Sequence, residues 1–100
     1  MTIYVDQFPE GWGKWTGGGH MLTTNIFELH DMARKIGLKK EWFQKDGRFP
    51  HYDVQRRKRA LAIQHGAVEI EIGEIPNDVL VKDPHSGGYR KYGDRRAQTS

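Results

Sequence analysis

The sequence predicts a small α/β domain built on a three- to four-stranded, mostly parallel sheet, and three observations support this fold class. Residues 2–6 and 67–72 alternate apolar with polar side chains, as half-buried strands do. Residues 24–37 and 53–66 combine helical apolar spacing with a capping residue at the start and a glycine at the end. Strands that alternate with helices favour parallel pairing with right-handed crossovers. The expected order is strand, helix, strand, helix, strand.

The first predicted strand, residues 2–6, leads into a long loop over residues 7–20. This loop contains the run Gly17-Gly18-Gly19 and two tryptophans, Trp12 and Trp15. A glycine-rich segment that carries large apolar rings suits a lid over a ligand.

The first predicted helix starts at Thr24 or Asn25, either of which can cap it, and ends at Gly37. Its apolar residues follow the i, i+3, i+4, i+7 rule, which predicts one buried stripe composed of Leu29, Met32, Ala33 and Ile36.

The next segments complete the predicted sheet. Residues 41–44 are interpreted as a buried second strand, and Asp53 as the N-cap of a second helix that runs to His65 and stops at Gly66. The third strand follows over residues 67–72. Residues 79–81 are expected to add a short edge strand.

Charge and composition divide the chain into a compact α/β domain, residues 1–73, and an extension, residues 74–100, expected to be largely flexible. Residues 1–81 contain 11 basic and 11 acidic side chains, so the whole excess of +3 lies in the tail. A neutral body lacks the broad basic face that supports non-specific DNA binding. Nucleic acid is therefore a weakly supported partner.

The remaining composition excludes several classes. Cysteine is absent, which excludes disulfides and thiolate zinc sites. No apolar run approaches the ~20 residues that span a bilayer, and the N-terminus does not resemble a signal peptide. We expect a cytoplasmic protein without a membrane partner. The exposed edges of a small sheet also predict a homodimer.

Several short motifs occur in order and resemble one known family. They are Tyr4-Val5-Asp6, His20-Met21-Leu22-Thr23, Glu28-Leu29-His30, Ile36-Gly37-Leu38, Trp42-Phe43-Gln44, His51-Tyr52-Asp53 and Gly66-Ala67-Val68. The chain is similar over about residues 2–70 to a family of small bacterial and phage proteins described as a domain of unknown function. The resemblance implies domain limits and site candidates, and it implies no reaction.

A polar site is predicted at the carboxyl edge of the parallel sheet, where open α/β proteins bind ligands. Asp6 ends the first strand, while His20 and His51 lie in the loops that follow two strands. The start of the second helix and nearby arginines would hold a phosphate group. The predicted ligand-binding residues are Asp6, Trp12, Trp15, His20, Gln44, Arg48, His51, Tyr52, Arg56 and Arg57.

An alternative set of ligands would bind a divalent metal, because imidazole and carboxylate suit zinc, manganese or iron. The candidates are Asp6, His20, His30 and His51. Their spacing is not that of a local metal motif, so this alternative depends on convergence in the fold. Otherwise the cofactor is unknown, and no catalytic residue is assigned.

Some candidates also have ordinary structural interpretations. Asp6 caps its own loop as readily as it binds a ligand. Asp53 is interpreted as a helix cap, and His30 as a half-buried histidine beside an apolar stripe. Arg56-Arg57-Lys58-Arg59 spreads around a helix and is interpreted as solvated surface.

Three functions follow. The first is a binding module that captures a small phosphate-bearing or nucleotide-like ligand and sequesters a signalling nucleotide. The second is a metal-assisted phosphoester hydrolase that uses Asp6, His20 and His51. The third is a nucleic-acid or protein-interaction accessory that acts through the basic tail.

Overall fold

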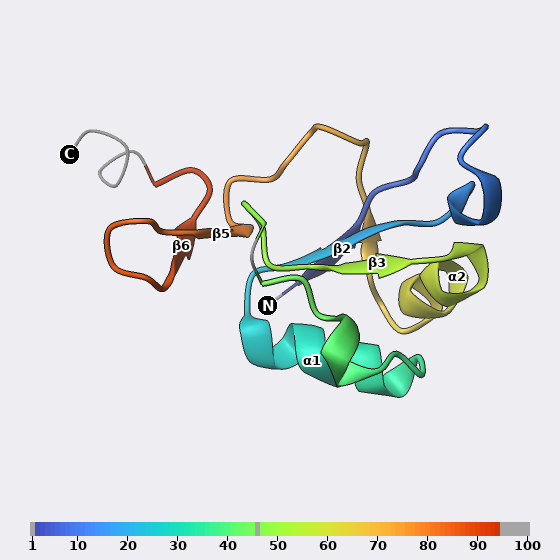
Figure 1. The fold of residues 1–100 in the computed structure, drawn as a ribbon, viewed down its shortest axis with the longest axis horizontal. Coiled ribbons are helices and arrows are strands. Elements are labelled where there is room, and N and C mark those ends of the chain that lie inside the picture. Colours follow the sequence, from blue (N-terminus) through green and yellow to red (C-terminus); the bar gives the residue numbers. More distant parts are fainter. Residues whose placement is uncertain (1, 46, 95–100) are drawn as a thin grey trace.

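The computed structural model describes residues 2–45 and 47–94. Its centre is a four-stranded sheet, which lies above α1 (Ile26–Lys35) in Figure 1. The strands, in the spatial order β3-β2-β1-β4, are β1 (Ile3–Val5), β2 (Gly19–Thr23), β3 (Tyr52–Val54) and β4 (Val68–Glu69). β2 runs antiparallel to both of its neighbours, β1 and β3, and only β1 and β4 pair in parallel. The sheet is therefore mixed and mostly antiparallel.

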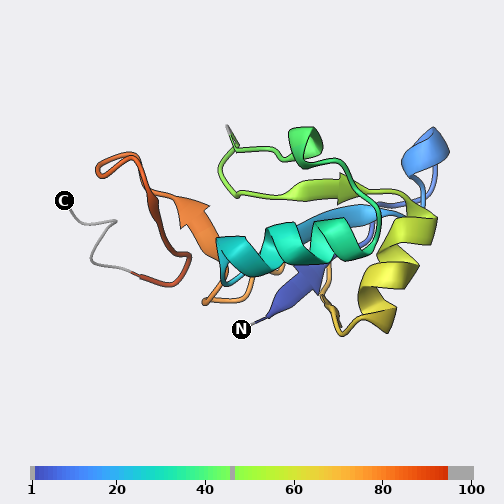
Figure 2. The same cartoon turned by 90° about the horizontal axis from the view of Figure 1, so that it is seen from below.

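Both α-helices pack against one face of this sheet (Figure 2). The first, α1 (Ile26–Lys35), begins at Asn25, whose side-chain oxygen accepts a hydrogen bond of 3.2 Å from the backbone N–H of Glu28. It ends just before Gly37, whose φ of +84° strains any residue with a side chain. The predicted limits are confirmed, as is the buried stripe of Leu29, Met32, Ala33 and Ile36.

The second helix, α2 (Arg56–Gln64), is anchored to the sheet by a buried arginine. Arg59 is only 8% exposed. Its Nε donates to the backbone carbonyl of Asp6 at 2.7 Å, and its Nη2 donates to the carboxylate of Glu69 at 3.0 Å. The basic run at residues 56–59 is therefore not wholly solvated surface, because one of its members ties α2 to β1 and β4.

The core fills the space between the helices and the sheet. Its fully buried side chains come from both layers: Val5, Met21, Leu29, Val54 and Ala62. Two short 3-10 helices, η1 (Gly13–Trp15) and η2 (Lys40–Trp42), flank this body. In the part of the chain that the structure describes, no helix has the length and apolarity needed to cross a bilayer.

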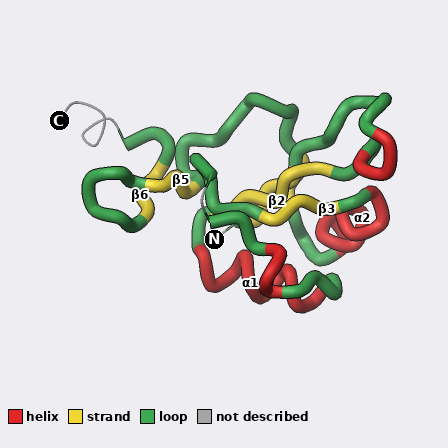
Figure 3. Tube along the Cα trace, viewed as in Figure 1, coloured by secondary structure: helices red, strands yellow, loops and turns green. Residues whose placement is uncertain are grey.

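The segment after β4 crosses the other face of the sheet and ends in a separate hairpin (Figure 3). The hairpin consists of β5 (Leu80–Lys82) and β6 (Tyr89–Lys91), which pair antiparallel. The backbone N–H of Lys82 donates to the carbonyl of Arg48 at 2.8 Å, and the Tyr4 hydroxyl donates to Asp78 at 3.1 Å. These contacts attach the extension to the body at Asp78 and Lys82. Of the extension predicted to be largely flexible, residues 74–100, the last six lie outside the described residues.

The predicted mostly parallel sheet with strand-helix-strand-helix-strand order is wrong, because a strand was missed inside the glycine-rich loop. Residues 19–23 form β2, which lies between β1 and β3 and runs against both. A Cβ on Gly18 would lie 2.0 Å from the carbonyl oxygen of Val54, and one on Gly19 would lie 2.1 Å from that of Asp6. These two glycines allow neighbouring backbones to approach closely.

Four other segments also differ from prediction. Residues 41–44 are not a buried strand: Glu41 and Trp42 belong to η2, and Gln44 forms only an isolated bridge with His51. Asp53 belongs to β3, and the N-cap of α2 is Gln55. The strand over residues 67–72 contracts to β4. The edge strand predicted at 79–81 exists as β5, but it pairs with β6 rather than with the main sheet.

Candidate functional site

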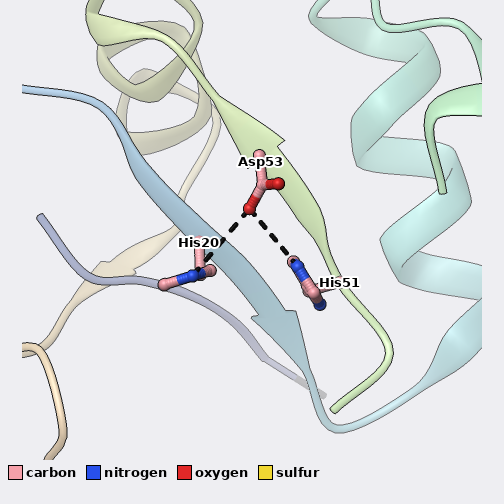
Figure 4. Close-up of side chains that lie close together, drawn as sticks. All are labelled: His20, His51 and Asp53. Atoms are coloured by element: carbon pink, nitrogen blue, oxygen red, sulfur yellow. Dashed lines mark ion pairs between the residues drawn. The ribbon is translucent and has the colours of Figure 1, made fainter. Parts of the chain in front are cut away.

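Four polar side chains gather on the sheet face opposite the helices, and we call them the His–Asp cluster: Asp6, His20, His51 and Asp53. Asp6 follows β1, and His20 in β2 pairs directly with Asp53 in β3 (Figure 4). His51 precedes Asp53 by two residues, and side chains two apart on an extended segment point to the same face. Three residues predicted from the sequence are thus brought together with a fourth.

Asp6 holds His20 in one orientation. Its carboxylate accepts one hydrogen bond of 2.6 Å from the backbone N–H of His20 and another of 2.8 Å from the ring Nδ1. Asp6 is only 2% exposed, so water competes little for these bonds. Because an ionised carboxylate only accepts hydrogen bonds, a neutral His20 ring carries its proton on Nδ1. Its Nε2 then has a free lone pair.

His51 is oriented in the same way by a different partner. Its Nδ1 donates to the backbone carbonyl of Phe49 at 2.8 Å, which again leaves Nε2 without the proton in the neutral ring. This Nε2 lies 3.3 Å from Oδ1 of Asp53, and the rings of His20 and His51 meet edge to face at 5.3 Å between centroids. The two histidines therefore turn their unprotonated nitrogens toward one region.

Asp53 completes that region. Its Oδ1 also lies 3.9 Å from Nε2 of His20, and the three atoms are all within 4.8 Å of one another. This oxygen is buried, yet no donor among the described residues forms a hydrogen bond to it. Nε2 of His51 approaches this oxygen without hydrogen-bond geometry, and the two groups form an ion pair only when the His51 ring is protonated. A buried carboxylate oxygen without a hydrogen bond is costly unless a cation balances it.

The pKa values of His51 and Asp53 shift in opposite directions. Burial by itself lowers the pKa of the His51 ring, but the adjacent Asp53 carboxylate and the Phe49 carbonyl outweigh it and raise the pKa above its usual range. The His51 ring in turn lowers the pKa of Asp53 against the opposing effect of burial, and His20 adds to this lowering. The cluster therefore favours a negative carboxylate beside a positive centre.

A cavity of about 360 Å³ opens beside the cluster, and Asp6, His20 and His51 line it together with Arg48 and Tyr92. The guanidinium carbon of Arg48 lies 5.4 Å from the ring centroids of both Phe49 and Tyr92. Stacking on two aromatic rings positions a guanidinium without consuming its hydrogen-bond donors. Arg48 can therefore bind an anion at the cluster.

The other predicted site residues lie elsewhere. Trp15 and Gln44 line a second cleft of about 510 Å³, whose wall also includes Asp53. Trp12 stacks on Phe8 at 4.9 Å between ring centroids, outside both hollows.

Four more predicted residues also lie apart from the His–Asp cluster: Arg56 and Arg57 on α2, and Tyr52 and His30 on the helix-covered side of the sheet. Arg56 lines a third, open hollow, whereas Arg57 is exposed on α2. Tyr52 is 1% exposed on the helix-covered side, where its hydroxyl lies 2.8 Å from Nδ1 of His30. His30 is therefore not part of the cluster.

Asp53 is the member of the His–Asp cluster that the sequence predicted as a helix cap. The signal was the two-residue spacing of His51 and Asp53, which a strand turns into a shared face. At the start of a helix, the Asp53 carboxylate would serve as a cap. In a strand it shares a face with His51.

The family model described as "Protein of unknown function (DUF4031)" matches residues 3–81. This chain belongs to the DUF4031 family. The match confirms the family resemblance and extends past Gly73 into β5. It includes the whole His–Asp cluster and leaves Tyr92 outside. Neither the curated proteins nor the solved structures contain a match to the chain.

Proposed function

We propose that this protein is a divalent-metal-dependent phosphoester hydrolase, with the metal held by His20, His51 and Asp53. The observation that carries the proposal is the anchoring of both histidines through Nδ1, which leaves both Nε2 atoms facing the buried Oδ1 of Asp53. Metal-binding histidines usually donate their other ring N–H to a carboxylate or backbone carbonyl, as His20 and His51 do here.

The distances support a site that closes slightly around an ion. Ligand atoms around a tetrahedral zinc stand roughly 3.4 Å apart, as follows from zinc–ligand bonds of about 2.1 Å. The separations from Asp53 Oδ1 are 3.3 Å to His51 and 3.9 Å to His20, and the two Nε2 atoms lie within 4.8 Å of each other. A tetrahedral ion would therefore require the ligand atoms to move closer together. Three protein ligands also leave a coordination position for water, as catalytic zinc sites do.

A bound metal would supply a hydroxide near neutral pH by lowering the pKa of its water, the released proton passing to solvent. Water activated at this position would form a new P–O bond as the ester P–O bond breaks, and the leaving alcohol oxygen would take a proton from solvent. Arg48 would neutralise charge on the phosphoryl oxygens, because it lines the same cavity. Asp6 acts as a positioning residue through His20 rather than as a metal ligand.

The test uses full-length protein, stripped with a chelator and then loaded with zinc or manganese. We expect roughly one metal per chain by elemental analysis and turnover of bis-p-nitrophenyl phosphate. Asp53→Asn should lower turnover by at least the roughly 10- to 100-fold that loss of an outer-shell partner causes. The proposal would be overturned if neither zinc nor manganese supports turnover.

A matched control is Asp31→Asn, because Asp31 pairs with Arg34 and Lys35 on the exposed side of α1, away from the cluster. This variant should keep the metal content and turnover of the unaltered protein. Equal losses in the two variants would contradict a specific role for Asp53.

A metal-independent binding module for a small phosphate-bearing ligand is the second candidate function, and the placement of Arg48 against the rings of Phe49 and Tyr92 at the cavity favours it. If the protein sequesters such a ligand, metal-free protein should bind it tightly. Protein loaded with zinc or manganese should then show no turnover. The tail-based accessory function and the homodimer stay predictions. Truncation after Lys82 and measurement of the molecular mass in solution test them.

A further inference from the structure

We propose that the second cleft binds the planar base of a mononucleotide whose phosphoester reaches the His–Asp cluster. The cleft, which we call the ring cleft, lies between η1, η2 and the start of α2. The residues that matter for recognition are Lys14, Trp15, Trp42, Gln44, Asp53 and Lys58. The inference rests on the proposed function for its chemistry, but base binding can be measured separately from turnover.

The first argument is the pair of indole rings. Trp42 from η2 is 48% exposed and Trp15 from η1 is half-buried, and both border the cleft. Large apolar rings that line an open hollow suit a ligand that covers them. Bases stack on aromatic side chains irrespective of their identity because every base has a π-face. A flat heterocycle is thus the ligand group that this lining fits.

The second argument is the polar lining. Gln44 and Gln55 each present an amide with both donors and acceptors, the complement of a base edge. Lys14 and Lys58 contribute two positive charges to the cleft. The carboxylates of Glu41 and Asp53 contribute two negative charges, which balance them. A metal bound at Asp53 would leave a net positive charge along the wall, which favours an anionic ligand.

The third argument is continuity with the cluster. Asp53 belongs both to the wall of the ring cleft and to the proposed metal ligands. Gln44 is fixed to His51 by two backbone hydrogen bonds, of 2.8 Å and 3.2 Å. One ligand can therefore place a ring in the cleft and an ester at the cluster.

The size and charge of the molecule favour a single nucleotide over a strand. The volume of about 510 Å³ lies in the range typical of small-molecule pockets. Residues 1–81, which form the cleft, carry 11 basic and 11 acidic side chains, so this part of the chain has no excess charge with which to follow a polyanionic backbone.

The experiment measures binding to metal-free full-length protein by calorimetry and tryptophan fluorescence. The probes are adenosine 5′-monophosphate, ribose 5-phosphate, which lacks the base, and a single strand of adenylate residues. We expect the mononucleotide to bind at least roughly fivefold more tightly than ribose 5-phosphate, the preference that one stacking ring provides. Trp42→Ala should abolish this preference.

The matched control is Trp12→Ala, because Trp12 is 50% exposed, nearly the same as Trp42, but lies outside the cleft. It should keep the preference. Trp15→Leu is a second variant that removes the other ring while filling its space, and it too should lose the preference. Melting temperatures of all three report whether each variant is folded.

Three results would overturn the inference: equal binding of the two monophosphates, equal effects of the Trp42 and Trp12 substitutions, or affinity for the strand that grows with its length. Base preference without turnover in any metal would support the ring cleft and reject the proposed hydrolase. Turnover of simple phosphodiesters without base preference would support the proposed hydrolase and reject the ring cleft.

Discussion

His30 and His51 are both partly buried and both lie beside β3, but they occupy opposite faces of the sheet and opposite electrostatic surroundings. Burial and the charge of Lys40 lower the pKa of His30, whose neighbours are the Tyr52 hydroxyl and the ring of Phe43. The Asp53 carboxylate raises the pKa of His51 against the effect of burial. The comparison shows that nearby carboxylates, rather than burial, distinguish the candidate site from a packed histidine.

The helix-covered face should govern stability, and Leu29→Ala tests this most strongly. Leu29 is fully buried, so its truncation should lower the free energy of unfolding by about 2–5 kcal/mol. Urea denaturation of metal-free protein measures the loss. The folded fraction of this variant should bind zinc as the unaltered protein does. Loss of zinc binding by fully folded Leu29→Ala would erase the distinction between the two faces.

The open face should govern metal affinity, and Asp6→Asn tests the positioning role. The amide no longer forces the proton of His20 onto Nδ1, so zinc affinity should fall by roughly 10- to 100-fold. Competition with a chromophoric chelator measures it.

Asp78→Asn is the matched control for this substitution, since Asp78 also accepts a hydrogen bond on this side of the sheet, from Tyr4. Its zinc affinity should be unchanged. Equal affinities in Asp6→Asn and Asp78→Asn would remove Asp6 from the site.

The smallest expected effect concerns stability. In metal-free protein, the free energy of unfolding should depend on pH differently in His51→Gln and His30→Gln. The folded pKa of His51 is raised, so its stabilisation is full below its ordinary pKa of 6.5 and is lost as the pH rises through the folded value. The folded pKa of His30 is lowered, so its contribution is present above 6.5 and is lost as the pH falls.

The free energies of unfolding lost in these two variants should therefore change with pH in opposite directions across roughly pH 5–8. Both rings are partly exposed, so differences in melting temperature should stay below about 5 °C. Parallel pH profiles for the two variants would mean that the two faces do not differ electrostatically.

Part of this architecture could be read from the sequence because it depends on local rules. The spacing of apolar residues, the Asn25 cap and the Gly37 stop specify α1 within a single segment. The alternation of Ile3 and Val5 likewise marks β1. Asp6, His20 and His51 could be selected as polar residues near the ends of such elements.

The rest depended on which segments pair. The run Gly17-Gly18-Gly19 was interpreted as a mobile loop, whereas two of its glycines allow β2 to fit between β1 and β3. With β2 in place the sheet becomes mostly antiparallel, and the argument from a carboxyl edge no longer applies. The cluster nevertheless forms, because cross-strand pairing sets His20 opposite Asp53.

The sequence by itself determined the first helix and the neutral charge of residues 1–81. It also placed Asp6, His20 and His51 among a small number of candidate site residues. Only the tertiary structure decided that Asp53 belongs to the His–Asp cluster, that His30 does not, and that Arg48 stands beside the cluster. Periodicity and capping act over a few neighbouring residues, whereas convergence requires strands distant in the chain to adopt one register. A one-residue shift of β2 against β3 would turn His20 or Asp53, but not both, to the helix-covered face and so separate the pair.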